Sequence, residues 1–184
     1  MKPTEELVKE HDSILLMLDV LGRSCRNLEE GTAVEHGDLL RMIDFVKVFA
    51  DGCHHAKEEG YLFPAMERAG VPREGGPIGV MLAEHDMGRK YVRGMVEALT
   101  RGSSSLNSDP SGFLHNARSY IHLLSQHIQK ENMILFPMAE RVLSDEQKSE
   151  LSGGFEKIEE EKVGHGKHEE FHALLSELKT RYLS

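Results

Sequence analysis

The sequence of 184 residues predicts an all-α protein, an up-down antiparallel four-helix bundle with additional C-terminal helices. An internal repeat and the spacing of apolar residues predict this fold. The tripeptide Glu-His-Asp at residues 10–12 recurs at 84–86, and the pattern His-x-x-x-Glu-x-x-x-x-Phe-Pro at 54–64 recurs at 127–137. Each half has two stretches with apolar residues three or four apart, which places them on one helix face. Short or moderate loops join these stretches and favour antiparallel neighbours.

The first half of the chain supplies two of the helices. The first has an apolar stripe over residues 7–28, and Gly31 is a suitable stop just past its end. The second is expected to start with Asp38 as its N-cap. Pro64 is expected to kink or end this helix, with Gly70 as a second stop.

The second half begins after a Pro- and Gly-containing loop at residues 70–77. Pro77 suits the first turn of the third helix, whose apolar stripe covers residues 78–99. A polar run with five serines at residues 101–112 is the longest expected linker. The fourth helix has its stripe at residues 113–138.

Two further helices are expected beyond the bundle. Ser144-x-x-Gln147 is a capping-box start for a short helix that is expected to break at Gly153-Gly154. A tail helix is expected after Gly166. Its apolar face consists of Phe171, Leu174, Leu175, Leu178 and Tyr182. This apolar face is expected to be buried against another part of the chain. The predicted organisation is therefore a bundle at residues 1–140 and a C-terminal extension at 141–184 packed on it.

Composition narrows the classes of function. The formal charge of −9 argues against nucleic acid as a partner. No apolar stretch reaches the roughly 20 residues that cross a bilayer, and residues 1–10 have no apolar leader, so no membrane partner is expected. Two cysteines, Cys25 and Cys53, fit a reducing compartment, and the cytoplasm is the expected location. Histidine, with 11 residues, is the unusual component.

Six ionisable residues occupy positions where the helical spacing requires apolar ones. They are His11, His54, Glu58, His85, His127 and Glu131. In an antiparallel bundle, the N-terminal ends of the first and third helices meet the C-terminal ends of the second and fourth. We therefore expect the six side chains to face inward at one end of the bundle. The i, i+4 spacing of each His-Glu pair places both residues on one helix face, about one turn apart.

Two buried carboxylates beside four imidazoles indicate a metal site. A lone histidine on an apolar face is more often a core residue, and protonated histidines offer a salt-bridged alternative, but an unpaired buried carboxylate is costly. The repeat divides the six residues into two sets of two histidines and one carboxylate, a pattern typical of non-haem Fe(II) centres with open positions. Because no thiolate belongs to the set, structural zinc is disfavoured. We expect two iron ions bridged by Glu58 and Glu131, with manganese or zinc as substitutes.

The motifs in chain order are His11-Asp12, His54-His55-x-x-Glu58-Glu59 with Leu62-Phe63-Pro64, Glu84-His85-Asp86, and His127-x-x-x-Glu131 with Leu135-Phe136-Pro137. Over about residues 1–140 they resemble the hemerythrin-like HHE cation-binding family. The resemblance implies a four-helix bundle with a non-haem di-iron centre, in a family whose members carry oxygen, sense oxygen or iron, repair iron-sulfur centres, or handle nitric oxide and peroxide. Oxygen-carrying members have a histidine where this chain has Arg89 and a bridging aspartate where it has Asn132. The present set resembles the repair and iron-sensing branches more closely.

The expected function is that of a non-haem di-iron protein that binds or senses oxygen, nitric oxide or peroxide, or handles iron. A di-iron enzyme that reduces peroxide or nitric oxide, or repairs iron-sulfur clusters, is the alternative. The expected ligand is a small diatomic or peroxide molecule, and the redox or protein partner stays open. Zinc hydrolysis at His168 and His172, which fit a His-Glu-x-x-His pattern, is a remote third hypothesis. Alternatively, His165, His168 or His172 completes the iron shell.

Other polar residues lie beside the six in the sequence. His55 is expected about 100° away from the core face, so that it either supports a ligand or lies at the surface. Glu59 is expected to have the same status. Carboxylates next to ligand histidines often orient them, and the candidates are Glu10, Asp12, Glu84 and Asp86.

Overall fold

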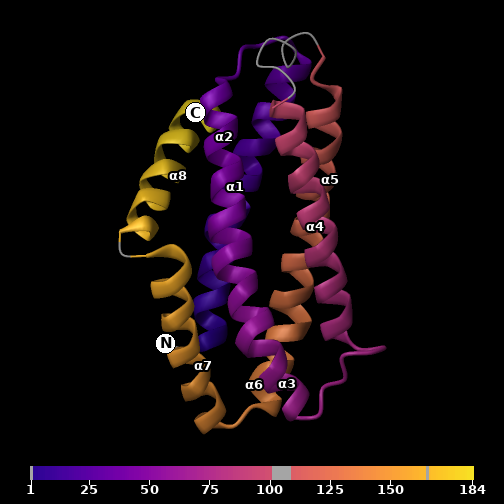
Figure 1. Ribbon diagram of the computed structural model, residues 1–184, viewed down its shortest axis with the longest axis vertical. Coiled ribbons are helices and arrows are strands. Elements are labelled where there is room, and N and C mark those ends of the chain that lie inside the picture. The colour runs from indigo at the N-terminus through magenta and orange to yellow at the C-terminus, as the bar shows by residue number, and fades with distance from the viewer. Residues whose placement is uncertain (1, 101–108, 165) are drawn as a thin grey trace.

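The computed structural model describes residues 2–100, 109–164 and 166–184, and these residues form helices and no strand (Figure 1). In chain order the segments are α1 (Pro3–Glu29), α2 (His36–Phe45), η1 (Val46–His55), η2 (Glu58–Leu62), α3 (Phe63–Arg68), α4 (Pro77–Thr100), α5 (Ser111–Lys130), η3 (Glu131–Leu135), α6 (Phe136–Val142), α7 (Asp145–Ile158), η4 (Glu159–Val163) and α8 (Lys167–Leu183), where η denotes a π-helical segment. The predicted all-α class is confirmed.

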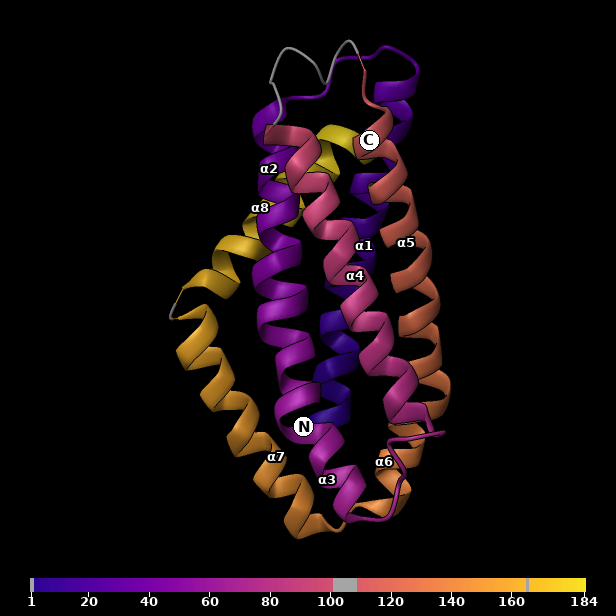
Figure 2. The ribbon, with the colours of Figure 1, turned by 45° about the vertical axis from the view of Figure 1, so that its right-hand side comes forward.

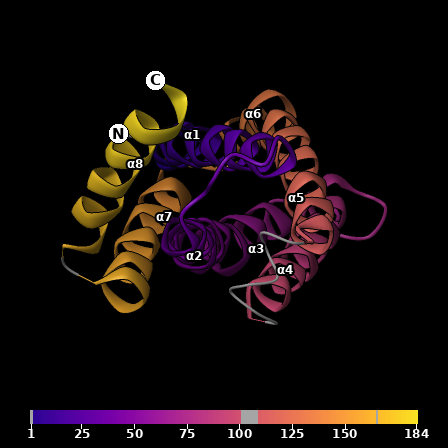
Figure 3. The ribbon, with the colours of Figure 1, turned by 90° about the horizontal axis from the view of Figure 1, so that it is seen from above.

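Four long rods make up the bundle: α1, α2 through α3, α4, and α5 through α6. Successive rods run in opposite directions, as the two side views show (Figure 1 and Figure 2). Seen from above, the rods surround a common axis, while α7 and α8 lie outside it beside α1 and α2 (Figure 3). The predicted antiparallel bundle with additional C-terminal helices is therefore confirmed.

Glycine and proline mark the rod ends that the sequence indicates. Gly31 and Gly70 follow α1 and α3 with φ of 72° and 93°, a backbone conformation that favours glycine. Pro77 is the first residue of α4, where its missing N–H has no helical partner to lose. Residues 101–108 of the predicted linker lie outside the described residues, and α5 begins at Ser111.

The expectation that Asp38 is an N-cap is wrong. The helix begins at His36, and Asp38 lies in its first turn with 3% of its surface exposed. Its carboxylate accepts hydrogen bonds from the Tyr182 hydroxyl at 2.8 Å and from Arg181 Nη1 at 2.5 Å. Asp38 therefore fixes the C-terminal helix α8 to the bundle, because a buried carboxylate needs such partners.

Pro64 does not end the second rod, which continues to Arg68. Proline lacks a backbone donor, and its ring clashes with the carbonyl four residues back in a regular α-helix. Here the π-helical segment η2 directly precedes the Phe-Pro pair, and the Phe63 N–H bonds the carbonyl of Glu58, five residues back. The segment η3 repeats this arrangement before Pro137. The wider π-turn accommodates the proline ring and its missing N–H, so each rod continues past its proline.

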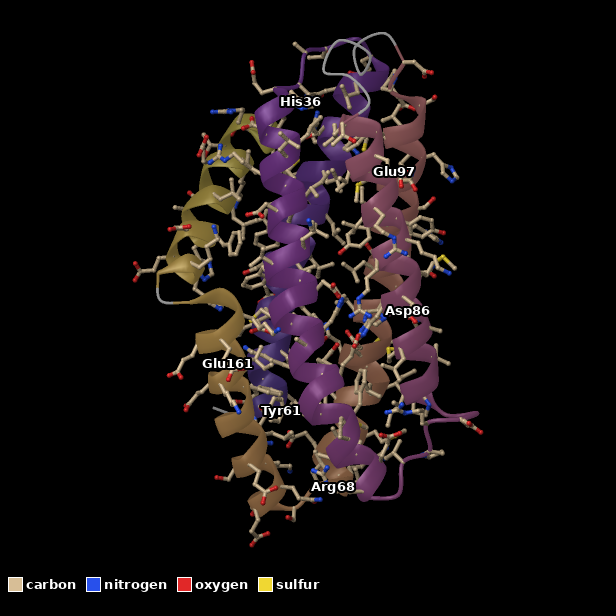
Figure 4. The ribbon with its side chains drawn as sticks, viewed as in Figure 1. His36, Tyr61, Arg68, Asp86, Glu97 and Glu161 are labelled. Carbon is tan, nitrogen blue, oxygen red and sulfur yellow. The ribbon has the colours of Figure 1, made fainter. Side chains whose placement is uncertain are left out.

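The predicted break at Gly153-Gly154 is also wrong. The capping box of Ser144 and Gln147 is present, but α7 runs through both glycines, and the helical path ends only at Gly164, with φ of 79°. Gly154 packs against Tyr61, whose Cδ1 would lie 2.2 Å from an added Cβ. Figure 4 shows Tyr61 between its own rod and α7. The glycine therefore permits a close approach of two helices.

Two apolar clusters fill the interior. The larger contains Ile14, Phe45 and Phe113 together with the apolar face of α8, and the smaller contains Leu7, Phe63 and Phe155 of α7. The tail's apolar face thus packs along the bundle, whereas the division into 1–140 and 141–184 stays a prediction. None of the described helices is long and apolar enough to span a membrane.

Candidate metal centre

A polar layer separates the two apolar clusters. It contains the six residues singled out in the sequence, which are His11, His54, Glu58, His85, His127 and Glu131. Each of them is at most 2% exposed. His11 lies one turn from Leu7 in one cluster and one turn from Ile14 in the other, so the layer crosses the bundle between them. All four rods therefore contribute to one buried polar site.

The four histidines meet as two pairs. Nε2 of His11 lies 2.9 Å from Nε2 of His54, and Nε2 of His85 lies 3.1 Å from Nε2 of His127. Two nitrogens that bind one ion at about 2.1 Å, at a right angle to each other, lie about 3 Å apart. The spacing within each pair therefore fits two ligands of a common metal ion. The pairs also follow the repeat, with one pair from each half of the chain.

Each glutamate reaches both pairs. The two carboxylate oxygens of Glu58 lie 3.6 Å from Nε2 of His54 and 3.4 Å from Nε2 of His85. Those of Glu131 lie 3.1 Å from Nε2 of His11 and 2.9 Å from Nε2 of His127. A carboxylate with one oxygen directed to each pair has the arrangement of a bridge between two ions.

The six side chains suit cations because lone pairs on their buried oxygens and nitrogens have no hydrogen-bond donor. None of the four oxygens of Glu58 and Glu131 has a hydrogen-bond partner among the described residues, since the short contacts to imidazole lack hydrogen-bond geometry. When a neutral imidazole donates from Nδ1, its Nε2 carries only a lone pair. Buried oxygens and nitrogens that face one another in this way are costly unless a cation satisfies them.

Partners outside the layer orient the imidazoles. Nδ1 of His54 donates to Glu10, that of His127 to Glu84, and that of His85 to Glu59, at 2.7–2.8 Å. Nδ1 of His11 donates to the amide oxygen of Asn132 at 2.8 Å. Such partners fix the ring orientation and direct Nε2 inward.

The sequence therefore indicates part of this outer set correctly. Glu10 and Glu84 have the expected orienting contacts, and Glu59 joins them. Asp12 is exposed, and Asp86 instead accepts a hydrogen bond from Arg89. Asn132 orients His11 from outside the layer.

Burial makes the protonation states of the layer unequal. Desolvation raises the pKa of Glu58 well above its usual value, and the nearby charge of Glu131 raises it further. Burial also acts to raise the pKa of Glu131, but His127 and His11 outweigh it and hold that pKa well below its usual value. Burial acts to lower the pKa of His127, but Glu131 and Glu84 raise it to about 9. Without metal, Glu58 therefore holds its proton more strongly than an ordinary glutamate, and His127 is charged at neutral pH.

His55 also belongs to the layer, so of its two expected positions the structure excludes the surface. It is 4% exposed, and its ring stacks on that of His85 with centroids 3.9 Å apart. His55 belongs to the π-helical segment η1, which changes its angle from His54. A π-turn holds more residues than an α-turn, so successive side chains are separated by less than 100°. The sequence feature that could have indicated this position is that His55 directly follows His54.

Lys57 also lies beside the layer, and no feature of the sequence indicates its position. It is fully buried, and Nζ donates to Glu6, Glu10 and Glu159 at 2.5–2.7 Å. Because Glu10 also accepts from His54, this lysine connects the layer to η4 in the C-terminal extension. Arg89 has a comparable position on the other side, where it binds Asp51 and Glu59.

The C-terminal histidines do not join the layer as far as the structure describes them. His165 lies outside the described residues. His168 groups with Cys53 and Glu159, and His172 is exposed. No metal-capable cluster among the described residues contains both His168 and His172, which gives the zinc-hydrolase hypothesis no support.

A cavity of about 240 Å³ approaches the layer between the second rod, α4 and α5. Its walls include His55, His85, Arg89 and Tyr120. Gly88 also lines it, and Tyr120 Cε2 lies close by, 3.4 Å from the place that a Cβ of residue 88 would take. The cavity therefore brings solvent-accessible space to the edge of the buried site.

Comparisons with known proteins point to one family. A family model described as the hemerythrin HHE cation binding domain matches residues 2–139. Uncharacterized proteins of Mycobacterium tuberculosis and Mycobacterium bovis are 22% identical over 160 residues, which cover 87% of this chain and 62% of each relative. The iron-sulfur cluster repair protein YtfE of Yersinia pestis is 35% identical over 91 residues, or 48% of this chain and 41% of that protein. The chain thus spans about six tenths of the mycobacterial relatives, and no solved structure matches it.

Proposed function

Because this chain belongs to the hemerythrin HHE cation-binding domain family, we propose that it holds two non-haem iron ions in its buried polar layer. One ion is bound by His11 and His54, and the other by His85 and His127. Glu58 and Glu131 bridge them. Manganese or zinc can take the same positions, because affinity order alone does not select iron.

One observation carries this proposal: each glutamate directs one oxygen to each histidine pair, at 2.9–3.6 Å from Nε2. A hydrogen-bonded core would not need two unpartnered carboxylates in this arrangement. The pairing along the repeat also gives each ion two imidazoles of its own and a share of both carboxylates. Such a donor set leaves coordination positions free on both ions.

Free positions on iron favour a role with small ligands. We propose that the protein binds or senses oxygen, nitric oxide or peroxide, or handles iron itself. The iron ions supply the positions at which such a molecule binds. The chain keeps the site dry with two apolar clusters, and the cavity lined by His55, His85 and Tyr120 provides the approach from solvent.

Iron-sulfur cluster repair or another redox reaction is the second candidate function. The similarity to the iron-sulfur cluster repair protein YtfE favours it. Steady-state consumption of peroxide or nitric oxide with an electron donor separates catalysis from binding. Turnover that stops when His54 and Glu58 are replaced would favour the enzyme, whereas binding without turnover would favour the sensor.

Iron content tests the main proposal. The purified chain is reconstituted with ferrous ion without oxygen, desalted and assayed for iron. We expect two irons per chain for the natural sequence and at most one for the double variant His54→Ala, Glu58→Ala. The matched control His122→Ala, an exposed histidine on α5, should keep two. Two irons retained in the double variant would overturn the assignment.

A further inference from the structure

One buried nitrogen of the polar layer has no role in the six-residue site. Nε2 of His55 is inaccessible to solvent and has no hydrogen-bond partner among the described residues. The whole residue is 4% exposed. An unpartnered imidazole nitrogen in a dry interior is costly and needs an explanation.

The position of His55 is fixed from two sides. Its ring stacks on that of His85 with an interplanar angle of 17°, and it meets the ring of His127 edge-on at 5.7 Å. Its Nδ1 lies 3.3 Å from Asp51 Oδ1. Asp51 in turn accepts from Arg89 Nε at 2.9 Å, so the acceptor itself is held in place.

This arrangement matches that of the other four histidines. In all five, Nδ1 faces an oxygen outside the layer, and Nε2 is left for the interior. One ligand atom each from His55, Glu58, His85 and His127 lies within 4.8 Å of all the others, a spacing that suits one shared ion. His11, His54, Glu58 and Glu131 form a second group of this kind. Glu58 belongs to both groups.

We propose that His55 is a fifth imidazole ligand, bound through Nε2 to the same metal ion as His85 and His127. This inference rests on the proposed di-iron function and deepens it. The two iron positions are then unequal, with three imidazoles on one ion and two on the other. His55 and His85 both line the cavity, and the ion at His11 and His54, with one imidazole fewer, keeps more free positions for an incoming ligand.

The test counts ligand histidines in the ferrous protein by proton NMR. A bound paramagnetic ion shifts each Nδ1–H of a ligand imidazole far from the ordinary range, and these signals disappear in D2O. We expect five such signals from the full chain and four from His55→Ala. The exposed-histidine variant His122→Ala should keep five. Four signals in the natural sequence, unchanged in His55→Ala, would overturn the proposal.

Metal affinity gives a second measurement that keeps the test decisive. His55→Gln, which retains a flat polar side chain for stacking on His85, serves if the alanine variant does not fold. We expect one of the two ferrous ions to bind about tenfold or more weakly in either variant. Equal affinity of both ions for variant and natural protein would contradict a ligand role. Failure of the parent proposal looks different, because the natural protein would then bind no iron and give no shifted signals.

Discussion

At the scale of single residues, the two glutamates of the layer differ although the repeat makes them equivalent. His127 and His11 lie within 3.1 Å of Glu131 oxygens, whereas Glu58 is 3.4–3.6 Å from its imidazoles. The closer histidines stabilise the Glu131 carboxylate, whereas burial and the charge of Glu131 favour the protonated form of Glu58, so the pKa values of the two carboxyls move apart. The metal-free site therefore holds protons that a metal ion has to displace.

Metal affinity should accordingly rise with pH. His127, with a pKa of about 9, and Glu58, with a raised pKa, must both lose protons to become ligands. Between pH 6.5 and 9 the apparent affinity for Mn(II) should increase about tenfold per pH unit for each proton displaced. Calorimetry in buffers of different ionisation enthalpy measures the released protons directly. An affinity that does not change over this range would contradict these protonation states.

The stability of the metal-free protein should change in the opposite direction. The pKa of His127 is raised from about 6.5 in the unfolded chain to about 9 in the folded one. Its stabilising contribution is complete below pH 6.5 and is lost as the pH rises through 9. Urea denaturation of the chelator-treated protein at pH 6.5 and 9 should give a lower free energy of unfolding at pH 9. Equal or higher stability at pH 9 would show that other groups dominate.

At the scale of elements, the π-turns η2 and η3 begin at the two glutamates of the site and end before a Phe-Pro pair. The repeat thus reproduces a local distortion as well as a set of side chains. Each π-turn lets its helix pass the proline and gives the glutamate a position that a regular helix would not provide. The third π-helical segment near the site, η1, carries His54 and His55.

The contact of α7 with the second rod can be tested with two neighbouring glycines. Gly154→Ala puts a Cβ 2.2 Å from the Tyr61 ring, so helix or ring must move, and we expect a loss of about 1–3 kcal/mol of unfolding free energy. Gly153→Ala meets no atom within 4 Å and should gain up to about 1 kcal/mol, because alanine favours a helix. Urea denaturation compares the variants. Equal effects at both positions would contradict the proposed close contact.

At the scale of the whole molecule, a network of charges joins the C-terminal extension to the polar layer. It runs from Glu159 of η4 through Lys57 to Glu10, which orients His54. The aromatic ring of Phe155 lies under the Lys57 ammonium, 5.6 Å from its centroid. At the other end of the extension, Asp38 binds Arg181 and Tyr182. Two polar anchors therefore hold the extension to the bundle.

Removal of the Lys57 charge should destabilise the folded protein. Lys57→Met leaves three carboxylates without their common partner, and we expect a loss of about 3–5 kcal/mol of unfolding free energy. The exposed control Lys9→Met should change it by less than about 0.5 kcal/mol. Glu159→Gln should have a smaller effect than Lys57→Met, because Glu6 and Glu10 still bind the lysine. A cost for Lys57→Met no larger than that for Lys9→Met would refute the anchoring role.

Features that depend on local spacing could be predicted from the amino-acid sequence. Apolar residues three or four apart specified the rods, Gly31 and Gly70 marked two ends, and the same spacing directed six ionisable residues inward, although they lie between two apolar clusters and not at one end of the bundle. These features can be predicted because helix geometry relates residues that are close in the chain. The family follows from the same motifs.

Features that depend on distant partners became visible in the folded chain alone. His55 enters the layer because η1 is π-helical and His85 offers a ring to stack on. Gly154 continues a helix because Tyr61 lies against it, and Asp38 is buried because Tyr182 reaches it. Lys57 is a buried cation because carboxylates from α1 and η4 converge on it. Each outcome depends on contacts between residues far apart in the chain, which local periodicity does not encode.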